Sequence, residues 1–399
     1  MHDKKQKLGM IGFGARGMVL LKEILLPMDR AEIVKVCDLY KDRAKTAADI
    51  IEEATKKRPE EVWDYKEILK DPKINIVLIS CSWEDHIQIA IEAMKEGKAV
   101  GIEIAGAYTV EQCHDLVRAY EETKTPIMLL ENCCYGRREM MALHMKELGV
   151  FGTIVHCKGG YHHDLRKEVS GGIKNRHYRL RNYLNRNCDN YPTHEFGPIA
   201  RILDINHGNR MISLTSTASK ASGLHEYIEA SMPQDPLVNS AFMQGDIVTT
   251  VIRCAGGETI TITLDTTLPR YYSRDFTVRG TKAMYEEATD SVFIDGEEDR
   301  QYDFKWKEKW GNAKEYEEKY DHPLWKEYLK EGIKGTHNGM DWLVFRDFFD
   351  YIEGKIPCPI DVYDMASWMC ISALSEESIL FGGRPVAVPD FTNGKWMTR

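Results

Sequence analysis

The spacing of hydrophobic positions divides the chain into two regions. Through the first 130 or so residues, short apolar runs alternate with segments whose apolar residues recur at helical spacing. Short buried strands joined by amphipathic helices predict right-handed βαβ units and a parallel sheet. The predicted strands are Lys7–Phe13, Glu32–Cys37, Ile74–Ser80, Ala99–Ile104 and Pro126–Leu130. The predicted helices are Arg16–Leu26, which Pro27 is expected to end, Asp42–Ala54, Glu84–Glu96 and Val110–Thr123.

Beyond residue 130 the apolar segments become longer and alternate with polar residues. In Thr259–Leu264 threonine alternates with isoleucine or leucine, which is typical of a sheet with one face toward water. Further strands are predicted at Gly152–Tyr161, Met211–Lys220, Ile247–Cys254, Thr259–Asp265 and Phe276–Gly280. Helices are predicted at Arg138–Leu148, Glu195–Leu203, Asp341–Glu353 and Val362–Phe381.

These patterns predict two domains. Residues 1–130 form an α/β Rossmann domain, and residues 131–399 form an α+β domain with a large, mainly antiparallel, open-faced sheet. The second domain is expected to bind substrate and to form the oligomer interface, and its C-terminal helices can pack back on the first domain. One sheet face lacks predicted helical cover, so a homodimer or homotetramer is expected.

A charged segment, residues 290–328, interrupts the second region. It is rich in Lys, Glu, Asp, Trp and Tyr, and it is interpreted as a surface excursion that serves as a lid or a dimer arm. Trp306, Trp310 and Trp325 can stack on a sugar ring or pack within this excursion. Both interpretations remain open from the sequence.

Composition and charge exclude several classes of protein. A chain of 399 residues with net charge −9 is a poor nucleic-acid binder, because phosphate neutralisation supplies most of that affinity. No apolar run reaches the ~18 residues of a membrane-spanning helix. The first strand starts by Leu8, which leaves no room for a signal peptide, so a cytoplasmic location is expected. The ten cysteines form no CxxC pair, so they are interpreted as reduced thiols, and no metal site is predicted.

A glycine-rich motif follows the first predicted strand and opens the first helix. Its residues are Gly12, Phe13, Gly14, Ala15, Arg16 and Gly17. The three glycines suit a tight turn, close approach of the backbone to a pyrophosphate, and close helix–strand packing. Asp38, at the end of the next strand, can accept hydrogen bonds from ribose hydroxyls. This acid favours NAD over NADP, although the nearby Arg43 keeps NADP open.

The region after the third strand resembles the Gfo/Idh/MocA oxidoreductase family. The resemblance rests on Val77–His86, Ala93–Lys98 and Glu103. It implies a Rossmann domain paired with an open-faced sheet domain, and an enzyme acting on sugars or polyols with a nicotinamide cofactor. It also implies further cofactor-binding residues, namely Ser80, Trp83, His86, Glu103 and His163.

Two departures from that family are informative. The common dehydrogenase form reads Glu-Lys-Pro where this chain reads Glu103-Ile104-Ala105, and isoleucine cannot transfer a proton. The second-domain motif Asp-x-x-x-His is replaced by Asn190–His194. One branch is similar in both respects, the NAD-dependent α-N-acetylgalactosaminidase-like glycoside hydrolases of family 109. The matching pieces are Glu131-Asn132, Tyr135–Arg137, Tyr161–Arg166, Arg179, Arg186-Asn187, Tyr191–His194, Gly197-Pro198, Tyr272–Arg274 and Gly280–Lys282.

The resemblance implies a redox-neutral glycosidase. Such an enzyme oxidises the sugar at C3, eliminates the glycosidic oxygen after loss of the C2 proton, adds water at C1 and reduces the ketone again. Groups that exchange protons near neutral pH are needed, which favours histidine, and tyrosine where cations stabilise the phenolate. His194 is predicted as the principal acid and base. Tyr191, Tyr161 and Tyr272 are candidates for the C2 base or the leaving-group acid.

Other residues are predicted to bind rather than to transfer protons. Arg179 and His163 can position the sugar or the nicotinamide ribose, and Arg186 can support the phenolates. Glu131 and Glu103 end the last Rossmann strands, where ligands bind, and are expected to contact sugar or ribose hydroxyls.

Two other functions remain open from the sequence. A conventional NAD-dependent sugar dehydrogenase, or a glycoside 3-oxidase, requires that the proton chemistry has moved to tyrosines. A non-enzymatic NAD-binding sensor fits the missing lysine, but the dense polar set between Tyr161 and His194 is costly to bury without a role.

Overall fold

The computed structural model describes residues 5–297 and 306–399, which form two compact units. Unit 1 contains Met1–Asn132 and Ile333–Ala366, and unit 2 contains Cys133–Gly332 and Ser367–Arg399. The long helix α16 (Val362–Leu380) therefore starts in unit 1 and continues in unit 2.

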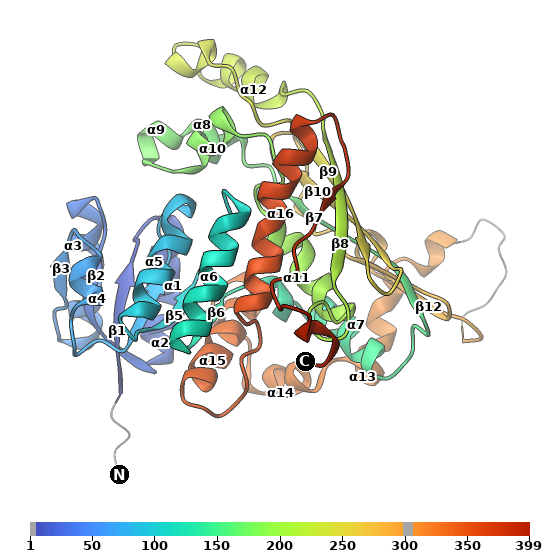
Figure 1. Cartoon of the computed structure of the whole chain (residues 1–399), viewed down its shortest axis with the longest axis horizontal. Helices are drawn as coiled ribbons and strands as arrows, with labels where there is room; N and C mark the ends of the chain where they lie inside the picture. The colour runs from blue at the N-terminus through green and yellow to red at the C-terminus, as the bar shows by residue number, and fades with distance from the viewer. Residues whose placement is uncertain (1–4, 298–305) are drawn as a thin grey trace. The chain divides into compact units, whose positions relative to one another are not determined.

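Unit 1 is built on a six-stranded parallel sheet, here sheet A (Figure 1). Its strands are β1 (Gln6–Ile11), β2 (Ala31–Cys37), β3 (Glu60–Val62), β4 (Ile76–Ile79), β5 (Ala99–Ile102) and β6 (Ile127–Leu129). They lie in the order β3-β2-β1-β4-β5-β6, which is the order of a dinucleotide-binding Rossmann sheet. The strand order reverses between β1 and β4, and ligands bind outside the carboxyl ends of the strands at such a point. The predicted Rossmann fold is confirmed.

Helices flank this sheet. They are α1 (Ala15–Leu20), a π-helical turn (Leu21–Leu25), α2 (Leu26–Met28), α3 (Lys41–Thr55), α4 (Lys66–Leu69), α5 (Trp83–Lys95), α6 (Val110–Thr123) and α15 (Met340–Ile352). The first helix was predicted to end at Leu26, before Pro27, but the helical segment continues for two more residues, to Met28. Pro27 lies in the first turn of α2, where a missing N–H is tolerated, and Asp29 with φ of 52° ends the segment. Helix α6 begins with a capping box between Thr109 and Gln112.

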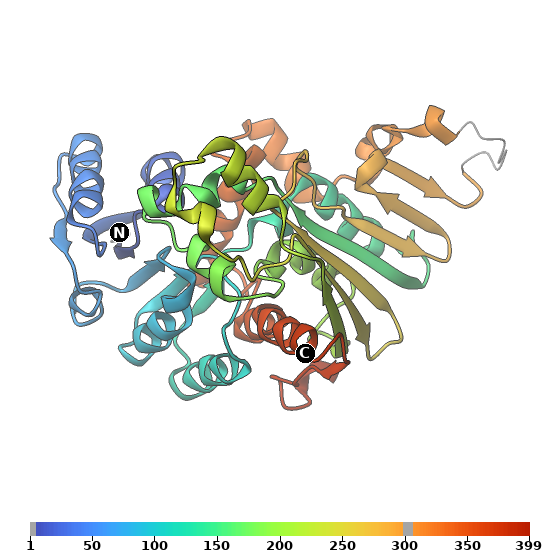
Figure 2. The same cartoon turned by 90° about the horizontal axis from the view of Figure 1, so that it is seen from above.

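Unit 2 is built on an eight-stranded sheet, here sheet B (Figure 2). Its strands are β7 (Ile154–His162), β8 (Met211–Ala218), β9 (Ile247–Cys254), β10 (Thr259–Asp265), β11 (Thr277–Gly280), β12 (Ala283–Glu286), β13 (Ser291–Ile294) and β14 (Val386–Ala387). They lie in the order β13-β12-β11-β7-β10-β9-β8-β14. Only the β7–β10 pair is parallel, so the predicted mainly antiparallel sheet is confirmed.

The alternation in the sequence explains the two faces of sheet B. In β10, Ile260, Ile262 and Leu264 are buried while the threonines between them are half-buried. Helix α11 packs on the buried face of β7 and β10. The helices of unit 2, besides α16, are α7 (Arg137–Glu147), α8 (Arg166–Ser170), α9 (Gly172–Asn175), α10 (Arg179–Asn185), α11 (Pro192–Ile202), α12 (Gly223–Ser231), α13 (Glu317–Tyr320) and α14 (Pro323–Glu331).

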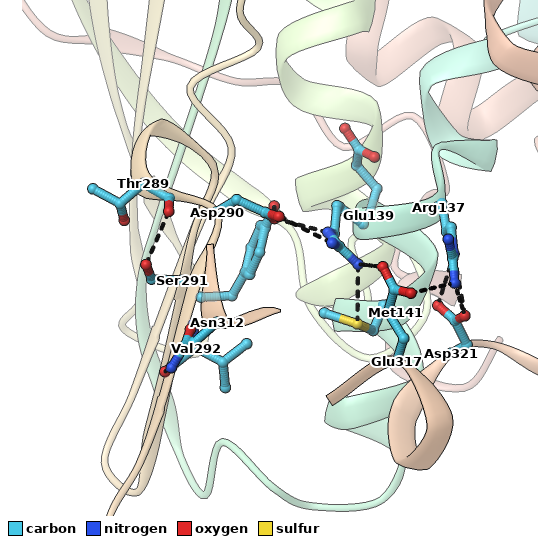
Figure 3. Close-up of polar contacts among 12 residues, drawn as sticks. Arg137, Glu139, Met141, Thr289, Asp290, Ser291, Val292, Asn312, Glu317 and Asp321 are labelled. Carbon is cyan, nitrogen blue, oxygen red and sulfur yellow. Dashed lines mark hydrogen bonds and ion pairs between the residues drawn. The ribbon is translucent and has the colours of Figure 1, made fainter. Parts of the chain in front are cut away.

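The charged segment 290–328 is anchored to α7 (Figure 3). Arg137 binds Asp321 and Glu317, and Arg138 binds Asp290 and the same glutamate. Residues 298–305 of the predicted excursion lie outside the described residues. The described part of the segment is therefore held to α7 by ion pairs near both of its ends, at Asp290 and at Glu317 and Asp321.

No helix among the described residues combines the length and the hydropathy that crossing a membrane requires.

Candidate active site

The glycine-rich motif forms a tight turn between β1 and α1. Gly12 has φ of 96°, and its N–H donates to the carbonyl oxygen of Cys37 at 2.8 Å. A Cβ at Gly17 would lie 2.2 Å from the carbonyl oxygen of Gly12, so only glycine permits this packing. At Gly14 a Cβ would meet only Arg43, at 3.8 Å, among the described residues. Space therefore remains beside Gly14, where a pyrophosphate would approach.

Asp38 connects the turn to the end of β2. Its carboxylate accepts hydrogen bonds from the backbone N–H of Phe13 at 2.7 Å and of Tyr40 at 2.9 Å. Each carboxylate oxygen has a further lone pair, so Asp38 can still accept from a ribose hydroxyl. Helix α1 begins at Ala15 without a side-chain cap, which leaves its first N–H groups suited to phosphate. These residues fit a dinucleotide.

Residues after β4 brace this turn. The hydroxyl of Ser80 donates to the carbonyl oxygen of Gly12 at 2.8 Å. Nε2 of His86 lies 3.2 Å from the carbonyl oxygen of Cys81, and burial lowers the pKa of His86 to about 4, so its ring is neutral. Trp83 is buried at the start of α5. Ser80 and His86 thus hold the backbone around the cradle through neutral hydrogen bonds.

Arg16 is bound by two acids. It forms a two-pronged hydrogen bond with Asp341, with both distances at 2.8 Å, and it reaches Glu103 at 3.0 Å. Burial raises the pKa of Glu103, and the charge of Arg16 partly offsets that rise. Glu103 follows β5 and Glu131 follows β6, so both lie at the carboxyl edge of sheet A and are buried, as the sequence predicts for their position. The contact between Asp341 and Arg16 could not be predicted from the sequence, because the two residues are 325 positions apart.

In unit 2, three predicted catalytic rings lie against one another. Tyr161, near the end of β7, has its ring centre 4.3 Å from that of Tyr191 and 5.4 Å from that of His194. The rings of Tyr191 and His194 are 4.8 Å apart. Tyr191 precedes α11 and His194 lies in its first turn, so the packing of α11 on β7 brings these side chains together.

Two further predicted residues complete this aromatic cluster. Nδ1 of His163 lies 3.0 Å from the hydroxyl of Tyr161, and its ring centre is 5.3 Å from that of Tyr272. Ser273, the neighbour of Tyr272, forms a β-bridge with His162 and so brings that tyrosine to the end of β7. Tyr271 is 95% exposed, as expected if only one of the two adjacent tyrosines faces the cluster.

The predicted arginines have different surroundings. The guanidinium of Arg179 lies 4.8 Å from the ring centre of Tyr191, and its Nε is 2.7 Å from Glu168. Arg186 forms a two-nitrogen ion pair with Glu376 of α16, with Nε at 3.0 Å. The structure therefore places Arg179 in the aromatic cluster and joins Arg186 to α16.

Burial controls proton affinity in the cluster. It raises the pKa of Tyr161, and the positive charge of Arg179 offsets only part of that rise. Desolvation of its hydroxyl group also raises the pKa of Tyr272, although that side chain is 47% exposed, and Arg274 offsets part of the rise. Burial, with a smaller contribution from Arg179, lowers the pKa of His163. The two tyrosines are thus proton donors at neutral pH, and His163 is a neutral acceptor.

A pair of carboxyl groups flanks the Tyr191–His194 segment, and the sequence analysis did not single it out. Asp189 and Glu195 are fully buried and lie close enough for each to affect the pKa of the other. A carboxylate only accepts, so the two side chains can share a hydrogen bond when one of them carries a proton. Burial raises the pKa of Asp189 to about 7 and raises the pKa of Glu195 well above its usual range, with the charge of Asp189 adding to the effect at Glu195. In the sequence, the position of Glu195 directly after the predicted catalytic residue His194 is the feature that could have pointed to this pair.

The sheet order, the glycine turn and Asp38 define an NAD-binding oxidoreductase fold joined to a second, sheet-based unit. Residues 6–130 match the model of the oxidoreductase family with an NAD-binding Rossmann fold, and residues 135–398 match that of the glycosyl hydrolase 109 C-terminal domain. The chain belongs to glycosyl hydrolase family 109, and it is an NAD-dependent enzyme of the Gfo/Idh/MocA type. The predicted family and the predicted cofactor, NAD, are confirmed.

Named relatives cover the whole chain. A glycosyl hydrolase family 109 protein of Stenotrophomonas maltophilia is 38% identical over 423 residues, covering 100% of this chain and 91% of the relative. An alpha-N-acetylgalactosaminidase of Tannerella forsythia is 36% identical, covering 100% and 88%. A solved levoglucosan dehydrogenase in complex with NADH has a TM-score of 0.72 at 19% identity, covering 97% of this chain and 100% of that one, and shows the shared fold.

Proposed function

We propose that the protein is a redox-neutral glycosidase, which cleaves a glycosidic bond by transient oxidation of the sugar at C3. The observation that carries this proposal is the aromatic cluster of Tyr161, Tyr191, His194, His163 and Tyr272 in unit 2. It offers several proton donors and acceptors in mutual contact, where a two-carboxylate glycosidase would need a pair of acids flanking the bond.

Bound NAD⁺ would supply a hydride acceptor for the C3 hydrogen and, once reduced, the hydride for the final reduction, so the cycle would have no net redox change. His194 removes the proton of the C3 hydroxyl as the carbonyl forms and gives it back at the end of the cycle. Histidine suits both directions because its proton affinity lies near neutral pH. Arg179, over the ring of Tyr191, holds positive charge beside these rings.

The C3 ketone acidifies the C2 proton, and Tyr161 with His163 serves this step. The C2 proton passes to the Tyr161 oxygen as the hydroxyl proton of Tyr161 passes to Nδ1 of His163, which burial keeps neutral, so no free phenolate forms. The C1–oxygen bond breaks as the C1–C2 double bond forms, and Tyr272 donates a proton to the departing oxygen. Water then adds at C1, a proton returns to C2, and the ketone is reduced.

The substrate class is a glycoside with a free C3 hydroxyl. The relative from Tannerella forsythia is named an alpha-N-acetylgalactosaminidase, which makes 4-nitrophenyl α-N-acetylgalactosaminide the first substrate to test. A panel of α- and β-linked 4-nitrophenyl glycosides extends the test to other sugars.

The deciding experiment follows 4-nitrophenol release and nicotinamide absorbance together, with purified protein and no added cofactor. We expect aglycone release without lasting NADH. His194→Ala should abolish turnover, whereas His225→Ala, on the exposed surface of α12, should not. Near-normal turnover by His194→Ala would refute the assignment of this histidine.

The same measurement separates the alternatives. Accumulating NADH without bond cleavage would identify a sugar dehydrogenase or a glycoside 3-oxidase, in which the cluster serves only hydroxyl oxidation. Sugar binding without either signal across the panel would identify a sensor. Either result would overturn the glycosidase proposal.

A further inference from the structure

Asp341, at the start of α15, is a buried carboxylate with an unusually complete set of donors. Its oxygens accept from both terminal nitrogens of Arg16, from Nδ2 of Asn132 at 2.8 Å, from the hydroxyl of Thr336 at 2.6 Å and from Nδ1 of His337 at 2.7 Å. The side chain has 0% exposure. Burial alone would raise the pKa of Asp341, but Arg16 and His337 hold it well below its usual range, so the group is ionised.

These bonds join three parts of the cofactor edge of unit 1. Arg16 belongs to the glycine-rich motif, Glu103 follows β5, and Asn132 follows β6. Asp341 comes from a segment some 200 residues further along the chain than Asn132. The guanidinium of Arg16 is committed to two acids, so Arg16 contributes its backbone N–H, rather than its charge, to the dinucleotide cradle.

The segment before Asp341 adopts a costly conformation. His337, Asn338 and Gly339 all have positive φ, of 50°, 53° and 90°. Two successive non-glycine residues in this region cost about 1 kcal/mol or more each, and such conformations persist where surrounding contacts over-determine them. Gly335 adds a contact, because a Cβ there would lie 2.5 Å from Ile24 in the π-helical turn that continues α1. The segment is thus held against the helix that the glycine motif opens.

We propose that Asp341 is a positioning residue for the cofactor. Through its hydrogen bonds to Arg16, Asp341 fixes the conformation of the glycine-rich turn and thereby slows the release of NAD. These hydrogen bonds order the glycine-rich turn before the dinucleotide binds. The entropic cost of ordering the turn is then not charged to binding. A cycle in which the hydride returns to the sugar benefits from a cofactor that does not leave between turnovers. In that last respect the inference rests on the proposed function.

The test measures NAD retention without any sugar. Wild-type protein, loaded with NAD and freed of excess, is diluted, and released NAD is followed by enzymatic assay over time. Asp341→Asn removes the charge that orders the turn before NAD binds, so the bound state must bear the ordering cost and NAD dissociates more readily. We therefore expect Asp341→Asn to release NAD at least tenfold faster than wild type, with a smaller thermal stabilisation by added NAD.

Asp350→Asn is the matched control. Asp350 lies on the same helix α15 and pairs with Arg30 at 2.8 Å and with Lys355, which are both outside the glycine-rich motif. The Asp350→Asn variant shows whether a general destabilisation of α15 is enough to speed the release of NAD. Should Asp341→Asn fail to fold, Arg16→Lys tests the same contact, because it keeps the charge and loses the two-pronged geometry.

Wild-type release rates in both Asp341→Asn and Arg16→Lys would overturn the inference. Equal acceleration in Asp350→Asn would also overturn it, since the effect would then belong to the helix as a whole. Because no sugar is present, a failure here is distinct from a failure of the glycosidase proposal.

Discussion

The hydroxyl of Tyr161 lies 3.0 Å from Nδ1 of His163, and the two rings meet edge to face. Because burial lowers the pKa of His163, its ring is neutral and can accept the Tyr161 proton while the Tyr161 oxygen takes up the proton from C2. As the pH falls, protonation of His163 removes this acceptor, so activity should decline on the acid side.

Tyr161→Phe removes this proton carrier while it keeps the ring. We expect kcat for glycoside cleavage to fall about 100-fold or more, the range of general acid–base contributions. Stability should fall by only about 1 kcal/mol, the usual value of one hydrogen bond. Steady-state kinetics and urea unfolding check both expectations. Tyr271→Phe, at the exposed neighbour, should match wild type, and unchanged kcat in Tyr161→Phe would exclude its proton transfer.

The glycine turn permits a test that separates folding from cofactor binding. Gly17→Ala puts a Cβ 2.2 Å from the carbonyl oxygen of Gly12, so the melting temperature of the NAD-free protein should fall. Gly14→Ala meets nothing closer than Arg43 at 3.8 Å among the described residues, so the NAD-free protein should melt normally.

The methyl group of Gly14→Ala nevertheless occupies the space in which a pyrophosphate approaches. Its NAD affinity should therefore weaken at least tenfold, measured by calorimetric titration of NAD into the apoprotein. Normal NAD affinity in Gly14→Ala would place the dinucleotide elsewhere.

The Asp189–Glu195 pair makes stability depend on pH. Both carboxyls have raised pKa values in the folded protein, Asp189 to about 7, so their favourable contribution is complete below about pH 4. It is lost as the pH rises through 7, because ionising both acids places two like charges together without water.

Glu195→Gln leaves one acid with a neutral hydrogen-bonding partner. The decline of the unfolding free energy between pH 5 and pH 8 should therefore be smaller than in wild type, as measured by urea unfolding at both pH values. Glu229→Gln, at a half-exposed glutamate of α12, provides the comparison. Parallel curves for wild type and Glu195→Gln would contradict the shared proton.

The tryptophans of the charged segment differ in role. Trp325 is 3% exposed, and its Nε1 donates to the carbonyl oxygen of Tyr135 at 2.9 Å, whereas Trp310 is 51% exposed. Trp325→Ala should destabilise the protein by about 3–5 kcal/mol, and Trp310→Ala by less than about 0.5 kcal/mol, in urea unfolding. A stability loss for Trp310→Ala that equals that of Trp325→Ala would show that both rings serve packing.

Assembly is a further prediction. The face of sheet B that carries Thr249, Val251, Thr261 and Thr263 is partly exposed, with Val251 at 44%. We expect light scattering to give the mass of a dimer or tetramer, and Val251→Glu to lower that mass, because it puts a charge on this face. A monomeric mass for wild type would contradict this prediction.

Local patterns predicted much of the fold. Strands β9 and β10 and helix α6 match their predicted ranges, because the alternation of a strand and the apolar spacing of a helix are visible within a few residues. Strands β3, β12, β13 and β14, of two to four residues each, were not predicted; runs this short show no period, and β4, β5 and β6 were predicted from their continuous apolar runs. The motifs also selected the rings of the aromatic cluster. Asp341 and Glu376 could not be predicted, because their partners Arg16 and Arg186 are distant along the chain.

The close approach of α11 to β7 has a consequence for how the site can change. A Cβ at Gly159 would lie 2.2 Å from the carbonyl oxygen of Glu195, so main chain meets main chain at this point. The separation of helix and strand is then independent of the size of the side chains around it. Neighbouring core positions can therefore exchange one apolar residue for another while the distance between Tyr161 and His194 stays the same. A single methyl group at residue 159 would increase that distance.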